Sequence, residues 1–273
     1  MFEANIASSD TTEHPSATVS PERTSARADD LATRLRGDAT LAALSPAERL
    51  AFLRRAVDGR IVFTHGFGIE GQLIVHWICE RNLDIDLVTL DTGRLFPETY
   101  ELWAETERRY GRRIRAIYPH RAALERLVAR QGIDGIYESK KARLACCDVR
   151  KTRPLDRALA GAAAWIAGLR ADQNANRREA GLVGFDESRG LLKFNPLHDW
   201  TREAVLAEVR RNGVPINTLH AKGFASIGCA PCTRAIAPGE PERNGRWWWE
   251  SDGHTECGLH LPRRGRATAK SAA

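Results

Sequence analysis

The sequence predicts an α/β fold built on a doubly wound, mostly parallel sheet, and two observations carry this prediction. Short, continuously apolar runs alternate along the chain with longer amphipathic segments. Strands that are apolar throughout are typical of parallel sheets covered by helices on both faces. The hydrophobic content of 42% in 273 residues is enough to bury a substantial core in one or two domains.

The expected elements follow in chain order. Ser45, with Pro46 next to it and Glu48 three residues on, forms a capping box that predicts the start of an amphipathic helix. Beyond that helix, apolar runs and helical periodicity predict strands at 60–64, 85–92, 113–119, 162–170 and 191–197, and helices at 70–81 and 97–111.

The two ends of the chain differ in composition from the centre. Residues 1–27 are rich in Ser, Thr, Pro and charged residues, so we expect a disordered tail, then a folded domain over 28–250 and a flexible segment over 251–273. The first residues lack the pattern of a secretory signal or transit peptide, and no apolar run reaches membrane-spanning length. We therefore expect a cytoplasmic protein that has no membrane partner.

The net charge of +6 is compatible with nucleic acid, an acidic protein or a small anionic substrate. The arginines are spread over amphipathic segments, and no dense basic run is interleaved with aromatic residues. This pattern argues against a nucleic-acid partner.

Ligands of parallel sheets bind at the carboxyl ends of the strands, so the turns that follow the predicted strands are candidate binding segments. The turn 64–71, THGFGIEG, could point backbone N–H groups at a phosphate or simply reverse the chain. Asp91 and Thr92 could contact a ligand or cap the next helix. The turn GLRADQNANRR could meet an anion or be solvated; it contains Gly168, Arg170, Arg177 and Arg178.

Six cysteines in a reducing compartment indicate metal binding or catalysis more often than disulfides. Cys146 and Cys147 are adjacent, and Cys229 and Cys232 form a CxxC pair. Four thiolates could bind zinc, but an adjacent pair suits an iron–sulfur cluster better, because the ligands bind different iron atoms. A disulfide between the adjacent pair, beside a redox-active CxxC, is the alternative.

Of four further cysteine and histidine side chains, one is expected to be a reactive thiol, and three are expected to have structural roles. Cys257 is flanked by Gly253, His254, Glu256 and Gly258, which predicts an accessible, reactive thiol, with an incidental surface thiol as the alternative. Cys79 lies on the apolar face of a predicted helix and is expected in the core, and we expect structural roles for His65 and His76.

Several motifs resemble the assimilatory adenylyl-sulfate reductases, the cluster-bearing branch of the phosphosulfate reductase family. They are CCDVRK, SIGCAPCTRAIAPGEPERNGRWWWE, ECGLH, LDTGRLFPETY, GLRADQ and KFNPLHDW, and together they span about residues 60–260. The resemblance implies an adenine nucleotide alpha hydrolase-like fold and Cys257 as nucleophile. It also implies a 4Fe-4S cluster held by Cys146, Cys147, Cys229 and Cys232.

The same resemblance implies the substrate and the partner. Adenylyl sulfate would be reduced to sulfite and AMP through a cysteine S-sulfonate, with thioredoxin or a glutaredoxin-like protein as thiol donor in sulfate assimilation; a homo-oligomer is left open. The phosphosulfate would lie beside Lys151, Arg243, Arg246 and His260. The adenosine would contact Leu90, Gly168 and one of Arg177 and Arg178. Gly66 and Gly71 depart from the family pattern, so one hydroxyl contact to the nucleotide is missing.

Three alternatives remain open at this point. A phosphoadenylyl-sulfate reductase would need cations for a 3′-phosphate and typically lacks the four cysteines. An ATP pyrophosphatase-type enzyme would need a Ser-Gly-Gly-x-Asp-Ser loop, which residues 64–71 do not supply. A non-enzymatic metal or redox sensor would not need Cys257.

Overall fold

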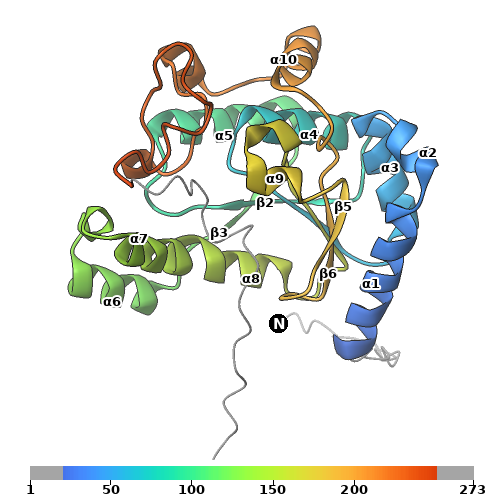
Figure 1. Cartoon of the computed structure of the whole chain (residues 1–273), viewed down its shortest axis with the longest axis horizontal. Helices are drawn as coiled ribbons and strands as arrows, with labels where there is room; N and C mark the ends of the chain where they lie inside the picture. Colours follow the sequence, from blue (N-terminus) through green and yellow to red (C-terminus); the bar gives the residue numbers. More distant parts are fainter. Residues whose placement is uncertain (1–20, 251–273) are drawn as a thin grey trace, which may run out of the picture.

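The computed structural model describes residues 21–250, and within them the chain forms a six-stranded sheet with the order β3-β2-β1-β4-β6-β5 (Figure 1). Every neighbouring pair is parallel except β5 and β6. The predicted doubly wound, mostly parallel sheet is therefore confirmed. The strands are β1 (Ile61–Thr64), β2 (Asp86–Leu90), β3 (Arg115–Ile117), β4 (Ala164–Ile166), β5 (Val183–Asp186) and β6 (Leu191–Phe194).

All strands except β5 lie within the ranges predicted from sequence. β5 was not predicted, because only Val183 of its four residues is buried and the strand lacks a continuous apolar run. It pairs antiparallel to β6 at the edge of the sheet, where one-sided burial is sufficient.

Helices cover both faces of the sheet. They are α1 (Pro21–Arg36), α2 (Ala39–Ala43), α3 (Pro46–Ala56), α4 (Ile69–Glu80), α5 (Pro97–Tyr110), α6 (Arg121–Gln131), α7 (Lys140–Cys147), α8 (Arg153–Leu159), α9 (Ala175–Arg178) and α10 (Arg202–Arg211). α4 contacts α3 and α10 on one side, whereas α8 contacts β2 and β3 on the other (Figure 1). None of the helices described between residues 21 and 250 has the length and apolar content needed to cross a membrane.

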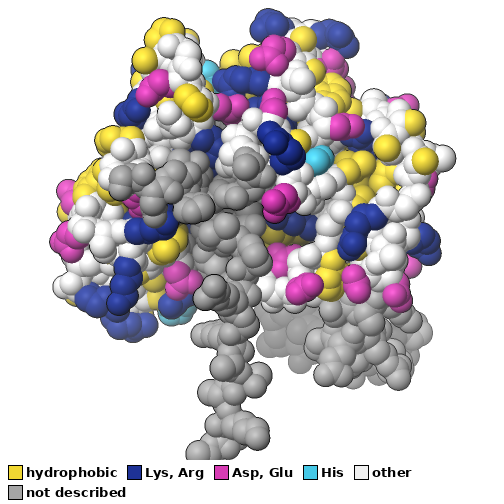
Figure 2. Space-filling model, in the orientation of Figure 1, with side chains coloured by type: hydrophobic (Ala, Val, Ile, Leu, Met, Phe, Trp, Pro, Cys, Tyr) yellow, Lys and Arg dark blue, Asp and Glu magenta, His cyan; other side chains and the backbone are white. Residues whose placement is uncertain are grey.

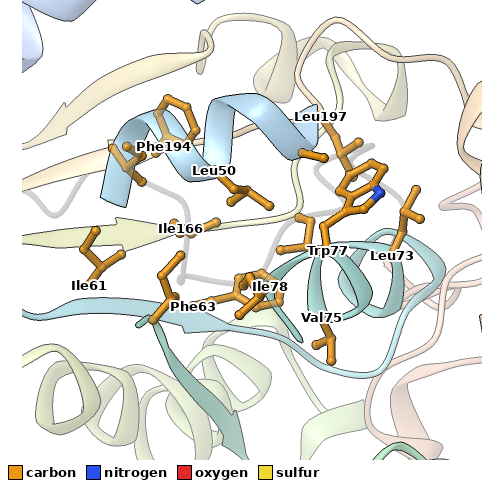
Figure 3. Packing of buried hydrophobic residues seen from close by; sticks show 14 of the residues in the cluster. Leu50, Ile61, Phe63, Leu73, Val75, Trp77, Ile78, Ile166, Phe194 and Leu197 are labelled. Carbon is orange, nitrogen blue, oxygen red and sulfur yellow. The ribbon is translucent and has the colours of Figure 1, made fainter. Parts of the chain in front are cut away.

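Alternate residues of each strand enter two different cores. In β1, Ile61 and Phe63 face the larger cluster with α3, α4 and α10, and Figure 3 shows Phe63 beside Ile78 of α4 and Ile166 beside Leu50 of α3. Val62, between them, faces a smaller cluster with α8. Both faces of the central strands are therefore covered, as their continuous apolar sequence predicts.

The first described helix corrects one boundary. We expected disorder up to residue 27, but α1 begins at Pro21, so residues 21–27 are helical. The reason lies further along the helix, where Ala32 and Leu35 are buried in the larger core and hold α1 against β5 and β6. Residues 1–20 and the predicted flexible segment 251–273 lie outside the described residues.

The three residues expected to be structural lie in or beside the larger core. His65 and His76 are buried, and Cys79 packs at the edge of the cluster. The His65 ring stacks on Phe63 with 5.3 Å between ring centres, and neither ring nitrogen has a hydrogen-bond partner. Burial lowers the pKa of His65 to about 3.

This burial predicts a pH-dependent loss of stability. Between pH 6.5 and 3 the unfolded chain binds a proton at His65 that the folded protein does not, so the free energy of unfolding falls as the pH falls. The His65→Phe variant keeps the aromatic stack but has no group that titrates at this position. Between pH 7 and pH 5, its free energy of unfolding should fall by about 2 kcal/mol less than that of the unsubstituted protein. Urea denaturation of both proteins at the two pH values measures the difference, and equal losses would contradict the prediction.

Candidate functional site

A cavity of about 230 Å³ opens at the carboxyl edge of the sheet. Its walls come from the loop after β1, the end of β2, the loop after β4 and the segment 225–247. Parallel strands bring these loops together although they are far apart in sequence, which is the usual position of ligand sites in such sheets.

Most of the residues proposed for the adenosine side line this cavity. Leu90, Gly168 and Arg177 are among its lining residues, whereas Arg178 is exposed and is not. A Cβ atom at position 168 would lie 3.3 Å from Cβ of Glu70, so the glycine allows the loop after β4 to approach the start of α4 closely. The structure therefore favours Arg177 of the two candidate arginines. The site of Gly66 is open, with no atom within 4 Å of the Cβ that another residue would add.

Three of the four residues proposed to bind the phosphosulfate lie in the described part of the chain, and all three line the same cavity. They are Lys151, Arg243 and Arg246. Arg246 is 6% exposed, and its Nε donates to the carbonyl of Cys232 at 3.2 Å. A Cβ atom at Gly228 would lie 2.3 Å from the Arg246 guanidinium, so any larger residue there would require the guanidinium to move.

Cys257 and His260 lie in the segment 251–273, outside the described residues. The roles expected for the nucleophile and for the fourth phosphosulfate contact stay predictions.

The four remaining site cysteines meet in a second, smaller cavity. Cys146 and Cys147 end α7, Cys229 directly precedes a single 3-10 turn, and Cys232 is the last residue of that turn. All four are buried and none forms a disulfide, so the disulfide alternative is not what the structure shows. Among residues 21–250, no three His, Cys, Asp or Glu side chains are grouped as closely as one metal ion requires. In a four-iron cluster, by contrast, each thiolate binds a different iron atom.

Positive charge surrounds these thiols. Burial raises the pKa of Cys229, but Lys151, the Thr92 hydroxyl at 3.3 Å from Sγ, and Arg246 outweigh it and bring the pKa below its usual value. Burial raises the pKa of Cys146 and, together with the charge of Cys229, that of Cys232 to about 11. A metal cluster would remove this penalty, because a bound thiolate shares its charge with iron.

The two cavities share part of their walls. Lys151, Arg246 and Trp247 line both of them. Lys151 belongs to a π-helical turn, Asp148–Thr152, which joins α7 to α8 directly after the cysteine pair. Such turns widen the helix locally and often occur at functional sites.

Sequence patterns did not reveal the ion pair that anchors the end of the described chain. Arg143 is almost completely buried, and its Nε and Nη2 donate to the two carboxylate oxygens of Glu250 at 2.8 and 2.6 Å. The guanidinium groups of Arg143 and Arg246 lie over the Trp247 ring, 4.6 and 4.7 Å from its centre. The sequence places Arg143 near the thiols, but nothing local identifies its partner 107 residues later.

Arg170 was expected either to meet an anion or to be solvated, and the anions that it meets are carboxylates of the protein itself. It is fully buried among the carboxylates of Glu70, Asp172 and Glu242. On the outer face shown in Figure 2, acidic and basic side chains are interspersed and do not form one basic patch.

Comparisons with known proteins agree with the fold and the motifs. A protein-family model described as "Phosphoadenosine phosphosulfate reductase domain" matches residues 60–235. The adenosine 5′-phosphosulfate reductase of Agrobacterium fabrum is 50% identical over 249 residues, which is 91% of this chain and 94% of that protein. The protein of the same name from Allochromatium vinosum is 50% identical over 213 residues, 78% of this chain and 83% of its own.

A solved structure supports the same grouping. The phosphoadenylyl-sulfate reductase of Candida auris, a phosphate complex, has a TM-score of 0.60 and 26% sequence identity. The match covers 81% of this chain and the whole of that one.

Proposed function

The chain belongs to the phosphoadenosine phosphosulfate reductase domain family, and from this premise we propose that it reduces adenylyl sulfate to sulfite and AMP in assimilatory sulfate reduction. The observation that carries the proposal is the cavity lined by Lys151, Arg243 and Arg246, which shares part of its wall with a smaller cavity that holds four buried thiols. Relatives named adenosine 5′-phosphosulfate reductase share about half of their residues with it over most of both chains. The free thiols of residues 146, 147, 229 and 232 are in keeping with a reducing, cytoplasmic location.

The chemistry is nucleophilic displacement at sulfur. The thiolate of Cys257 attacks the sulfur of adenylyl sulfate, an S–S bond forms, and the bond between sulfur and the bridging oxygen breaks. AMP takes the electron pair and leaves, and the enzyme is a cysteine S-sulfonate.

A dithiol partner of the thioredoxin or glutaredoxin type completes the cycle. Its thiolate attacks Sγ of Cys257 and sulfite leaves. The second thiol of the partner then resolves the mixed disulfide, so Cys257 is regenerated and the partner is oxidised. The two electrons that reduce sulfate to sulfite therefore come from thiols.

The cations would bind the substrate in two different ways. Arg243 and Arg246 can offer paired N–H donors to sulfate and phosphate oxygens, and Lys151 adds a point charge from the wall shared with the thiols. His260 is proposed as a fourth contact. Leu90, Gly168 and Arg177 would contact the adenosine, while Gly66 leaves open space, in keeping with the missing hydroxyl contact expected from the departure from the family pattern.

A 4Fe-4S cluster fits the second cavity by its donors: four buried cysteines, with Arg94, Arg143, Arg150 and Lys151 beside them to balance thiolate charge. Cys146, Cys147, Cys229 and Cys232 would hold it. Since thiols supply the electrons, the cluster would contribute electrostatics to the neighbouring site, where Lys151 contacts both cavities.

We expect the Cys257→Ser variant to fold and keep its colour but to produce no measurable sulfite, because a serine hydroxyl cannot form the S-sulfonate. Sulfite assays with adenylyl sulfate and reduced thioredoxin test this directly. A sulfite rate near that of the unsubstituted protein would remove Cys257 from the mechanism.

Anaerobically purified protein should be brown and contain iron and acid-labile sulfide in equal amounts. Serine at any one of positions 146, 147, 229 or 232 should abolish colour and activity together, because a cluster that lacks one thiolate is usually unstable. The Cys79→Ser variant is the matched control and should keep both, since Cys79 packs beside the core and lines neither cavity. Zinc in place of iron in fresh protein would contradict the cluster.

The substrate choice follows from the cations. A 3′-phosphate would add roughly two negative charges on the ribose side, whereas Lys151, Arg243 and Arg246 are assigned to the phosphosulfate. We expect kcat/KM to favour adenylyl sulfate over its 3′-phosphorylated form by about 100-fold or more. Equal values for the two nucleotides would favour the phosphoadenylyl-sulfate reductase alternative.

A further inference from the structure

Arg170 joins three segments that are distant in sequence. It follows β4, and its side chain is 0% exposed. Nε donates to Glu70 in the first turn of α4 at 2.8 Å, and Nη2 donates to Glu242 at 2.7 Å. Asp172 accepts a third hydrogen bond. A guanidinium removed from water costs several kcal/mol unless it is paired, so these contacts fix the segments relative to one another.

The hydrogen bonds continue toward the nucleoside side of the cavity. Gln173 donates from Nε2 to Glu70 at 3.1 Å and accepts, through Oε1, from the side chain of Arg177. Glu70, Gln173 and Arg177 all line the cavity. This end of the network therefore reaches the arginine assigned to adenosine.

The other end reaches the phosphosulfate side. Glu242 lines the cavity and directly precedes Arg243 in a segment without helix or strand, 237–246, which also carries Arg246. Its second oxygen pairs with Arg202 at 3.2 Å. Glu242 is thus the point at which this segment is fixed to the loop after β4.

We propose that Arg170 is a positioning residue that, through Glu242, holds the segment of Arg243 and Arg246 against the nucleoside side of the cavity. Without that pair, the segment that carries the two arginines loses its link to the loop after β4, and with it their fixed distance from the nucleoside side of the cavity. The inference rests on the proposed function, because it assumes that a nucleotide with a second anionic group occupies the cavity.

The test compares binding of AMP and ADP, since ADP carries a phosphate where adenylyl sulfate carries its sulfate. Titration calorimetry on the full, cluster-loaded chain gives the ratio of the two dissociation constants. In Glu242→Ala we expect this preference for ADP to fall about tenfold, as for the loss of one charge-assisted contact, while AMP affinity changes less than about twofold. A purely structural role would weaken both nucleotides together.

Glu240→Ala is the matched control. Glu240 lies in the same segment and pairs with Arg234 at 3.0 Å, but it does not line the cavity. The control should keep the ADP preference of the unsubstituted protein. An equal fall in both variants would show general loosening of the segment and overturn the inference, as would an unchanged preference in Glu242→Ala.

Two further measurements separate this inference from the proposed function. Arg246→Ala should remove the ADP preference in an otherwise unsubstituted chain, because Arg246 lines the phosphosulfate side. If the unsubstituted protein bound neither nucleotide, or bound ADP no better than AMP, the proposed function itself would fail. If Arg246→Ala removed the preference and Glu242→Ala did not, only the role of Arg170 would fail.

Discussion

The complete burial of Arg170 is the constraint on which the geometry of the site depends. A buried guanidinium must be neutralised by the protein, and Glu70, Asp172 and Glu242 do so from different segments. Burial and the neighbouring Glu70 raise the pKa of Glu242, whereas the guanidinium groups of Arg170 and Arg202 act in the opposite direction and offset the repulsion between the two carboxylates. Two walls of the large cavity are thereby fixed by charge balance, whereas the sheet below them is fixed by apolar packing.

The sequence predicts the sheet better than the site, for a physical reason. Mostly apolar runs mark β1, β2, β4 and β6 because strands covered on both faces bury most of their side chains. The edge strand β5 lacks that signal. The capping box at Ser45 is equally local, and it is present as predicted, with Glu48 bonded to the Ser45 backbone.

The candidate site likewise contains residues that local sequence motifs identify and residues whose contacts depend on long-range packing. Motif resemblance located Lys151, Arg243 and Arg246, and these line the cavity. It could not choose between Arg177 and Arg178, since only the turn of α9 decides which one faces inward. Arg170 pairs with Glu70 and Glu242, which are 100 and 72 residues away along the chain, and Arg143 pairs with Glu250, 107 residues away, so no local pattern could reveal these pairs. Long-range ion pairs are set by tertiary packing, which periodicity and spacing do not encode.

The Arg143 pair with Glu250 has a consequence for how the proposed nucleophile is presented. Glu250 is fixed beside the cysteine cavity, and Cys257 follows it closely in the chain. A stretch of that length spans at most roughly 25 Å from covalent geometry alone. The thiol is therefore confined to a small volume around its anchor, at an effective concentration in about the millimolar range. Under the proposed mechanism, such tethering would make the attack of Cys257 on a bound nucleotide an intramolecular event, and the same length of chain would let the S-sulfonate reach a protein partner.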